Sequence, residues 1–177
     1  MDLFKAILLR HCYRGSFRQD SIPREDLREI VQAGLMAPSG KNLQTTRFVI
    51  VDRQDVLCQI AAICPVNQAV MEMRAMIACI VDREPDLLAD GPSFQVEDCA
   101  TAVDHMLLAA TALSYATVWI DGALRVENRA DRIGQLLGVP QAKVVRIILP
   151  LGNPAEPYQG PVKMSFEERA WFDRYGG

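Results

Sequence analysis

Residues 37–42 (APSGKN) form a sharp connection between a helical pattern and the apolar run at residues 48–51. Pro38 fixes one backbone dihedral angle, and Gly40 can adopt the positive φ that other residues avoid. The connection and the residues after it also carry hydrogen-bonding side chains, those of Ser39, Asn42 and Gln44. Pro, Ser, Gly and Asn are ordinary turn residues, but binding residues also gather on loops held between rigid elements. The stretch therefore indicates either a helix-to-strand turn or a binding loop.

Hydrophobic periodicity on both sides of this loop predicts a mixture of helices and strands. The pattern predicts helices at residues 2–13, 23–36, 55–63, 94–116, 127–137 and 165–172, and strands at 47–52, 76–82, 117–120 and 143–151. The second strand is apolar on both faces, and the helix at 94–116 is apolar around much of its circumference. No linker long enough to separate domains interrupts the 177 residues. We therefore predict one α+β domain, residues 1–177, with a central sheet and helices on both faces.

Composition excludes several classes of function. The net charge is −3 and no basic block is present, which argues against binding of nucleic acid or of an anionic membrane. The longest apolar run, residues 76–81, is too short to span a bilayer. Asp2 stands where a signal peptide would carry a base, so we predict a cytoplasmic protein. Five cysteines without a CxxC pair and only two histidines indicate reduced thiols and no metal site.

A cluster of bases follows the first predicted helix. Arg10 and Arg14 are four residues apart, so they share one face if the helix extends that far. With His11 between them they could clamp a phosphate, because the guanidinium group suits bidentate phosphate contacts. The alternative is a cationic cap, since bases in a last helical turn interact favourably with the helix dipole.

Two further segments leave alternatives open. Residues 84–93 carry two prolines and a glycine, and they form either a mobile lid or a plain surface loop. In the tail, residues 165–168 (SFEE) fit a capping box. Trp171 and Phe172 follow near the chain end and need a place of burial, either on their own domain or on a partner subunit.

Taken together, these stretches resemble the FMN-dependent nitroreductase family. Residues 10–14 (RHCYR) are similar to its N-terminal Arg-(Arg/His)-Ser-x-Arg segment. Residues 37–44 (APSGKNLQ) resemble its APSxxNxQ stretch, and residues 151–156 (LGNPAE) resemble its LGxPAE stretch. The resemblance covers nearly the whole chain, with some departures. Cys12 stands where the family has serine, and a thiol is a weaker hydrogen-bond donor than a hydroxyl. Thr45 and Thr46 stand where many relatives have Pro-Trp, and the chain is short for the family.

The resemblance implies a three-layer α/β/α fold with a mostly antiparallel sheet, and a homodimer with FMN at the subunit interface. It implies a phosphate site in the basic segment and the tail, formed by Arg10, His11, Cys12, Arg14 and Lys163. It places along the flavin ring a loop from the other subunit, with Pro38, Ser39, Gly40 and Asn42. It puts Asp121 and Gly122 near flavin N5, and Asn67 near the pyrimidine. Residues 153–177 become a C-terminal extension that packs on the partner subunit.

The function implied is an oxidoreductase that transfers a hydride from NADH or NADPH, through flavin N5, to a nitroaromatic, a quinone or a similar acceptor. No catalytic side chain is expected, because the hydride chemistry belongs to the flavin and the protein binds and orients it. The absence of a G-x-G-x-x-G sequence argues against a Rossmann dehydrogenase. The alternatives are an FMN-binding or flavin-storage protein with little turnover, and a relative that uses another electron donor.

Overall fold

The computed structural model describes residues 1–85, 91 and 93–177, and its centre is a sheet of four strands. The strands are β1 (Arg47–Val51), β2 (Ala75–Asp82), β3 (Ala116–Thr117) and β4 (Lys143–Gly152). Their order is β1-β2-β4-β3, and every neighbouring pair is antiparallel. The long pair β2 and β4 forms the middle of the sheet, with one register shift between Cys79 and Ile80.

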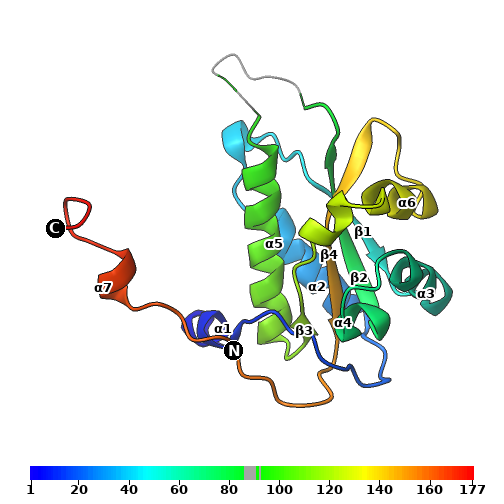
Figure 1. Cartoon of the computed structure of the whole chain (residues 1–177), viewed down its shortest axis with the longest axis horizontal. Helices are drawn as coiled ribbons and strands as arrows, with labels where there is room; N and C mark the ends of the chain where they lie inside the picture. The colour runs from blue at the N-terminus through cyan, green and yellow to red at the C-terminus, as the bar shows by residue number, and fades with distance from the viewer. Residues whose placement is uncertain (86–90, 92) are drawn as a thin grey trace.

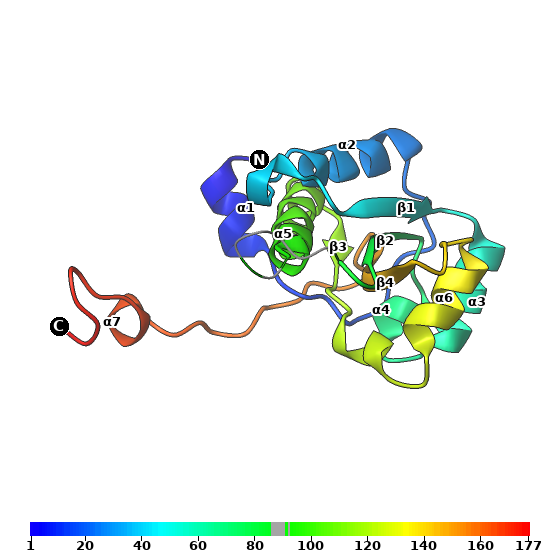
Figure 2. The same cartoon turned by 90° about the horizontal axis from the view of Figure 1, so that it is seen from above.

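Helices cover both faces of this sheet, as Figures 1 and 2 show. The helices are α1 (Leu3–Leu9), α2 (Arg24–Leu35), α3 (Gln54–Ile63), α4 (Gln68–Met71), α5 (Gln95–Ala112), α6 (Arg129–Leu136) and α7 (Phe166–Arg169), with 3-10 turns at Gly40–Asn42 and Gly122–Arg125. Residues of α2 and α5 share one core cluster, and residues of α3, α4 and α6 share the other. The predicted three-layer α/β/α arrangement with an antiparallel sheet is thus confirmed.

Strand β2 explains why two cores form. Its even-numbered residues from Met76 to Ile80 pack with α3, α4 and α6, whereas its odd-numbered residues from Ala75 to Val81 pack with α2 and α5. Successive side chains of a strand point to opposite faces, so a strand apolar at every position must be covered on both sides. The prediction that this strand is buried on both faces is confirmed.

The first helix is shorter than its pattern predicts. It ends at Leu9, and Arg10 already has an extended backbone with φ −63° and ψ 124°. The main chain then leaves the helix because Tyr13 and Phe17 are buried in the core and the Tyr13 amide donates to the Thr117 carbonyl at 2.9 Å. The prediction that Arg10 and Arg14 share a helix face is therefore wrong.

Two other boundaries differ from the sequence pattern. The helix predicted at 94–116 ends at Ala112, because Ser114 takes a left-handed backbone with φ 69°. The strand predicted at 117–120 reduces to the two residues of β3, followed by an isolated bridge between Ile120 and Ile148. Of the predicted excursion at 84–93, residues 86–90 and 92 lie outside the described residues.

The tail after Gly152 runs along the N-terminal segment and then extends away from the rest of the chain (Figures 1 and 2). The predicted capping box is present at Ser165 and Glu168, at the start of α7. Two ring contacts lie within the tail itself: Trp171 with Tyr175 at 4.4 Å and Phe166 with Phe172 at 5.9 Å between centroids. Phe172 remains 81% exposed and Tyr175 91%.

Candidate functional site

A basic cleft of about 940 Å³ lies between the N-terminal segment, α5 and the tail. The residues predicted to hold a phosphate all line it: Arg10, His11, Cys12, Arg14 and Lys163. Arg169 also lines the cleft, and it is a cation that sequence reasoning missed although its capping box was recognised. Asp104 of α5 is an acid on the same wall. Five bases thus converge on one hollow from two segments far apart in the chain.

The segment 10–14 is shaped by one buried anchor, Tyr13. Its side chain is 2% exposed, and its hydroxyl donates to the Ser16 carbonyl at 2.6 Å. Because neighbouring side chains of an extended segment point in opposite directions, burying Tyr13 turns Arg14 outward toward the cleft. His11 is held separately, by a 2.8 Å hydrogen bond to the Leu9 carbonyl and by stacking on Tyr158 with centroids 4.8 Å apart.

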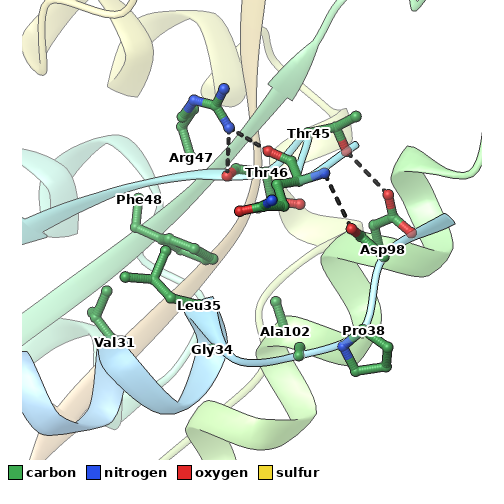
Figure 3. Close-up of a pocket in the computed structure, with 13 residues that line it drawn as sticks. Val31, Gly34, Leu35, Pro38, Thr45, Thr46, Arg47, Phe48, Asp98 and Ala102 are labelled. Carbon is green, nitrogen blue, oxygen red and sulfur yellow. Dashed lines mark hydrogen bonds between the residues drawn. The ribbon is translucent and has the colours of Figure 1, made fainter. Parts of the chain in front are cut away.

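The loop at 37–44 is fastened to the start of α5 by Asp98. This carboxylate is 7% exposed and accepts from the Gly40 amide at 2.8 Å. It also accepts from the Thr45 hydroxyl at 3.3 Å (Figure 3). The Gln44 amide also donates to the Ser39 hydroxyl at 3.1 Å. A buried charge is tolerated when hydrogen bonds satisfy it, so Asp98 fixes the loop and the loop in turn shields Asp98.

Three residues of this loop have a left-handed backbone, and Gly40 is not among them. Lys41, Asn42 and Gln44 have φ of 52°, 56° and 50°, whereas Gly40, the residue best able to adopt positive φ, lies outside that region. Glycine is required there for space, because a Cβ would lie 2.4 Å from Cδ2 of Phe94. Left-handed backbone at a non-glycine residue costs of order 1–3 kcal/mol and gathers at functional sites. The loop is therefore strained as well as fastened.

Replacing Asp98 tests this fastening. Asp98→Ala leaves the Gly40 amide without its acceptor, and an unsatisfied buried amide costs about 1–3 kcal/mol. We expect the free energy of unfolding, measured by urea denaturation, to fall by that amount. The control is Glu97→Ala, which removes an exposed carboxylate from the same turn of α5. Equal stability of the two variants would contradict the role given to Asp98.

A second cavity of about 380 Å³ lies behind the loop (Figure 3). Pro38 and Ser39 line it together with Val31, Phe48 and Ala102. Gly40 and Asn42 belong to the loop but line neither this cavity nor the basic cleft. Within the described part of the chain the two hollows share no residue, so a single copy of the chain does not join its own loop to its own basic cleft.

The remaining predicted residues lie outside both hollows. The Asn67 side chain caps α4 by accepting from the Val70 amide at 3.0 Å. A Cβ at Gly122 would meet no atom within 4 Å. Asp121 is held by two arginines, with Arg146 Nη1 at 2.5 Å and Arg125 Nε at 2.9 Å from its Oδ1. These contacts fix the turn at Asp121 and Gly122 against β4.

Asp121 gives the fold a dependence on pH. Burial alone would raise the pKa of this carboxyl, but hydrogen bonds and charges from Arg125 and Arg146 outweigh burial and lower it below its ordinary value. A lowered pKa contributes stability above the unfolded value of about 4, and this stability is lost as pH falls through the folded value.

We therefore expect Asp121→Asn to cost about 1–3 kcal/mol near neutral pH, because it removes charged hydrogen bonds. The cost should shrink as pH falls below about 4, where the wild-type carboxyl is protonated too. Urea unfolding at stepwise lower pH measures both effects. Asp20→Asn, at an exposed position, is the control. A cost that is the same at neutral and at acid pH would contradict this account of Asp121.

The same described residues offer neither a metal-binding cluster nor a membrane-spanning helix. They contain no group of three His, Cys, Asp or Glu side chains arranged to hold a metal ion. Nor do they include a helix with the length and apolar character needed to cross a membrane. All five cysteines are free thiols, and Cys64, Cys79 and Cys99 are buried.

The three-layer fold with this antiparallel sheet is shared with solved structures of bacterial proteins. A structure titled "Putative NADH dehydrogenase/NAD(P)H nitroreductase" from Bacteroides thetaiotaomicron superposes with a TM-score of 0.83 over 98% of both chains, at 24% identity. A structure titled "putative nitroreductase in complex with fmn" from Desulfovibrio desulfuricans has a TM-score of 0.80 and 26% identity, covering 98% of this chain and 97% of the other.

Sequence comparison gives the family. The model of the Nitroreductase family matches residues 7–153, and the chain belongs to this family. An Archaeoglobus fulgidus protein named "Putative NADH dehydrogenase/NAD(P)H nitroreductase" is 30% identical over 155 residues, which are 88% of this chain and 87% of that protein. The resemblance found from the three sequence stretches is thus confirmed.

Proposed function

We propose that this protein is an FMN-dependent oxidoreductase that accepts a hydride from NADH or NADPH and reduces a nitroaromatic, a quinone or a similar small acceptor. One observation carries the proposal: the residues predicted for a phosphate line a single basic cleft. The names of the relatives, which include NAD(P)H nitroreductase and an FMN complex, support the same class of reaction.

The residues of the cleft fit the phosphate end of FMN. A phosphate dianion needs fixed positive charge and hydrogen-bond donors, and guanidinium groups supply both in one planar fork. Arg10 and Arg14 offer such forks from one side, and Lys163 and Arg169 offer cations from the tail. The volume of about 940 Å³ is in the range of small-molecule sites. When bound, FMN would supply the hydride chemistry, and these side chains would hold and orient it.

The ring end of the cofactor requires a second copy of the chain in this proposal. Pro38, Ser39, Gly40 and Asn42 lie on a loop that is separate from the cleft of the same chain. A homodimer would bring the loop of one subunit to the cleft of the other. Helix α1 supports such an interface, because Phe4 is 75% exposed and Leu8 84%. Large exposed apolar side chains gathered in this way mark interaction surfaces.

Three further residues receive roles at the ring. Asn67 is proposed near the pyrimidine, and Asp121 and Gly122 near N5, where the Gly122 amide would face the flavin. The arginine contacts of Asp121 hold that turn in place. The open space beside Gly122 leaves its backbone approachable. No side chain of this chain is proposed as a catalytic group, and residues 153–177 are proposed to pack on the partner subunit.

The deciding experiment is a visible absorption spectrum of the purified protein with FMN, followed by anaerobic addition of NADH and then of NADPH. We expect a bound flavin band that bleaches with at least one of the two donors and returns when a quinone or nitroaromatic compound is added. A band that neither donor bleaches would favour flavin storage or another electron donor. A protein that takes up no FMN would refute the proposal.

A further inference from the structure

The hydrogen bond of His11 limits what this side chain can offer a ligand. Its Nδ1 lies 2.8 Å from the Leu9 carbonyl oxygen, in the last turn of α1. A carbonyl oxygen can only accept, so Nδ1 must carry a proton and donate it. Nε2 is therefore the nitrogen left for a ligand. In the neutral ring Nε2 has a lone pair and no proton, and only the protonated ring has an N–H there.

The ring is held in this orientation from several sides. Tyr158 stacks on it with an interplanar angle of 30°. The backbone passes close by, since a Cβ at Gly160 would lie 3.0 Å from Cβ of His11. Exchanging the two ring nitrogens would break the bond to Leu9. His11 therefore meets the cleft with an acceptor when neutral and with a donor when protonated.

A phosphate dianion has acceptors only, so it cannot pair with a bare Nε2. We infer that FMN binding takes up about one proton, which lies between Nε2 of His11 and a phosphate oxygen. This inference rests on the proposed function, because it takes the basic cleft as the phosphate site. The proton can be assigned formally to either partner, and it comes from solvent on binding when the free ring is neutral and the free phosphate is a dianion.

The charges on the cleft side of the ring explain why the proton arrives with the ligand. Besides His11, four bases and one acid line the cleft. Its charged and titratable groups are Arg10, Cys12, Arg14, Asp104, Tyr158, Lys163 and Arg169. A bound phosphate dianion adds negative charge beside the ring and favours its protonated form.

A smaller cavity on another side of the ring carries fewer charges. Its volume is about 250 Å³, and its charged and titratable groups are the Met1 amine, Tyr13, Tyr115, Glu156 and Tyr158. One acid and one amine line this cavity, so this side has little net charge. The change on binding therefore arises in the basic cleft, where the phosphate enters.

The test is titration calorimetry of FMN binding between about pH 6.5 and 8.5, in phosphate-free buffers that differ in protonation enthalpy. Three proteins are compared: wild type, His11→Gln and His105→Gln. Glutamine keeps an N–H donor but cannot take up a proton. The uptake measured for His11→Gln is therefore that of the phosphate without the histidine. His105 is the other histidine of the chain; it lies on α5 with its ring at 3.2 Å from the Ala33 carbonyl.

We expect wild type and His105→Gln to take up more protons than His11→Gln, by up to about one per FMN. Their affinity should also fall more steeply with pH, by up to about tenfold per pH unit relative to His11→Gln. If His11→Gln fails to fold, His11→Lys serves instead, since lysine is already cationic and should remove the extra uptake. Equal uptake by wild type and the His11 variant overturns this inference while the proposed function stands. Absence of FMN binding at every pH overturns both.

Discussion

Arg14→Ala is expected to weaken FMN binding by about 1.5–3 kcal/mol, which is a roughly ten- to hundredfold increase in Kd. Arg14 is exposed at the cleft, and in the proposed site its guanidinium forms charged hydrogen bonds to the phosphate. The loss should fall mainly on binding, so turnover at saturating FMN should change less than affinity. Flavin fluorescence quenching on titration gives Kd directly.

Arg18→Ala is the matched control for this prediction. Arg18 is an exposed base four residues further on, and it does not line the cleft. It changes the net charge of the protein as much as Arg14→Ala does. If the two variants lose the same affinity, the effect comes from general electrostatics and Arg14 holds no phosphate. Riboflavin, which lacks the phosphate, should bind wild type and Arg14→Ala alike.

Deletion of residues 161–177 is expected to have the larger effect, because it should remove both the dimer contact and part of the cofactor site. Aromatic anchors at protein interfaces contribute about 2 kcal/mol or more each, and the tail carries Phe172 and Tyr175 almost fully exposed. We therefore expect a monomer in sedimentation or light scattering. FMN affinity should fall as well, since Lys163 and Arg169 leave the cleft.

A second variant separates these two effects. The double replacement Trp171→Ser and Phe172→Ser keeps both cations and removes only aromatic surface. It should weaken the dimer while the positive charges of the cleft remain. A truncated protein that stays dimeric would show that α1 and the body of the domain suffice for the interface. A dimeric double variant would place the contact elsewhere in the tail.

Much of the fold could be predicted because its signals are local. The run at β2 is apolar at every position, which requires a layer on each face, and the prolines and glycines mark where elements end. The basic residues of the cleft were also within reach, since Arg10, His11 and Arg14 are neighbours in sequence. All three line the cleft, but they meet in an extended segment and not on the helix face that their spacing indicated.

What could not be predicted depends on contacts between distant residues. The first helix stops early because Tyr13 pairs with Thr117, a partner that helical periodicity cannot reveal. Glycine at position 40 is set by the ring of Phe94, and Asp98 fastens the loop from another helix. Arg169 reaches the cleft only because the tail runs beside the N-terminal segment.

The pairing between the N-terminal segment and the end of β4 has a consequence for biosynthesis. Phe17 bridges to Pro154, Arg18 donates to Asn153, and a Cβ at Gly152 would lie 2.4 Å from the Phe17 ring. The segment at residues 17 and 18 therefore has its partner much further along the chain, at residues 153 and 154, and that partner is synthesised later. At roughly 5–20 residues per second it waits for many seconds with Phe17 unburied. The basic cleft takes residues from both the N-terminal segment and the tail, so it can form only after this wait.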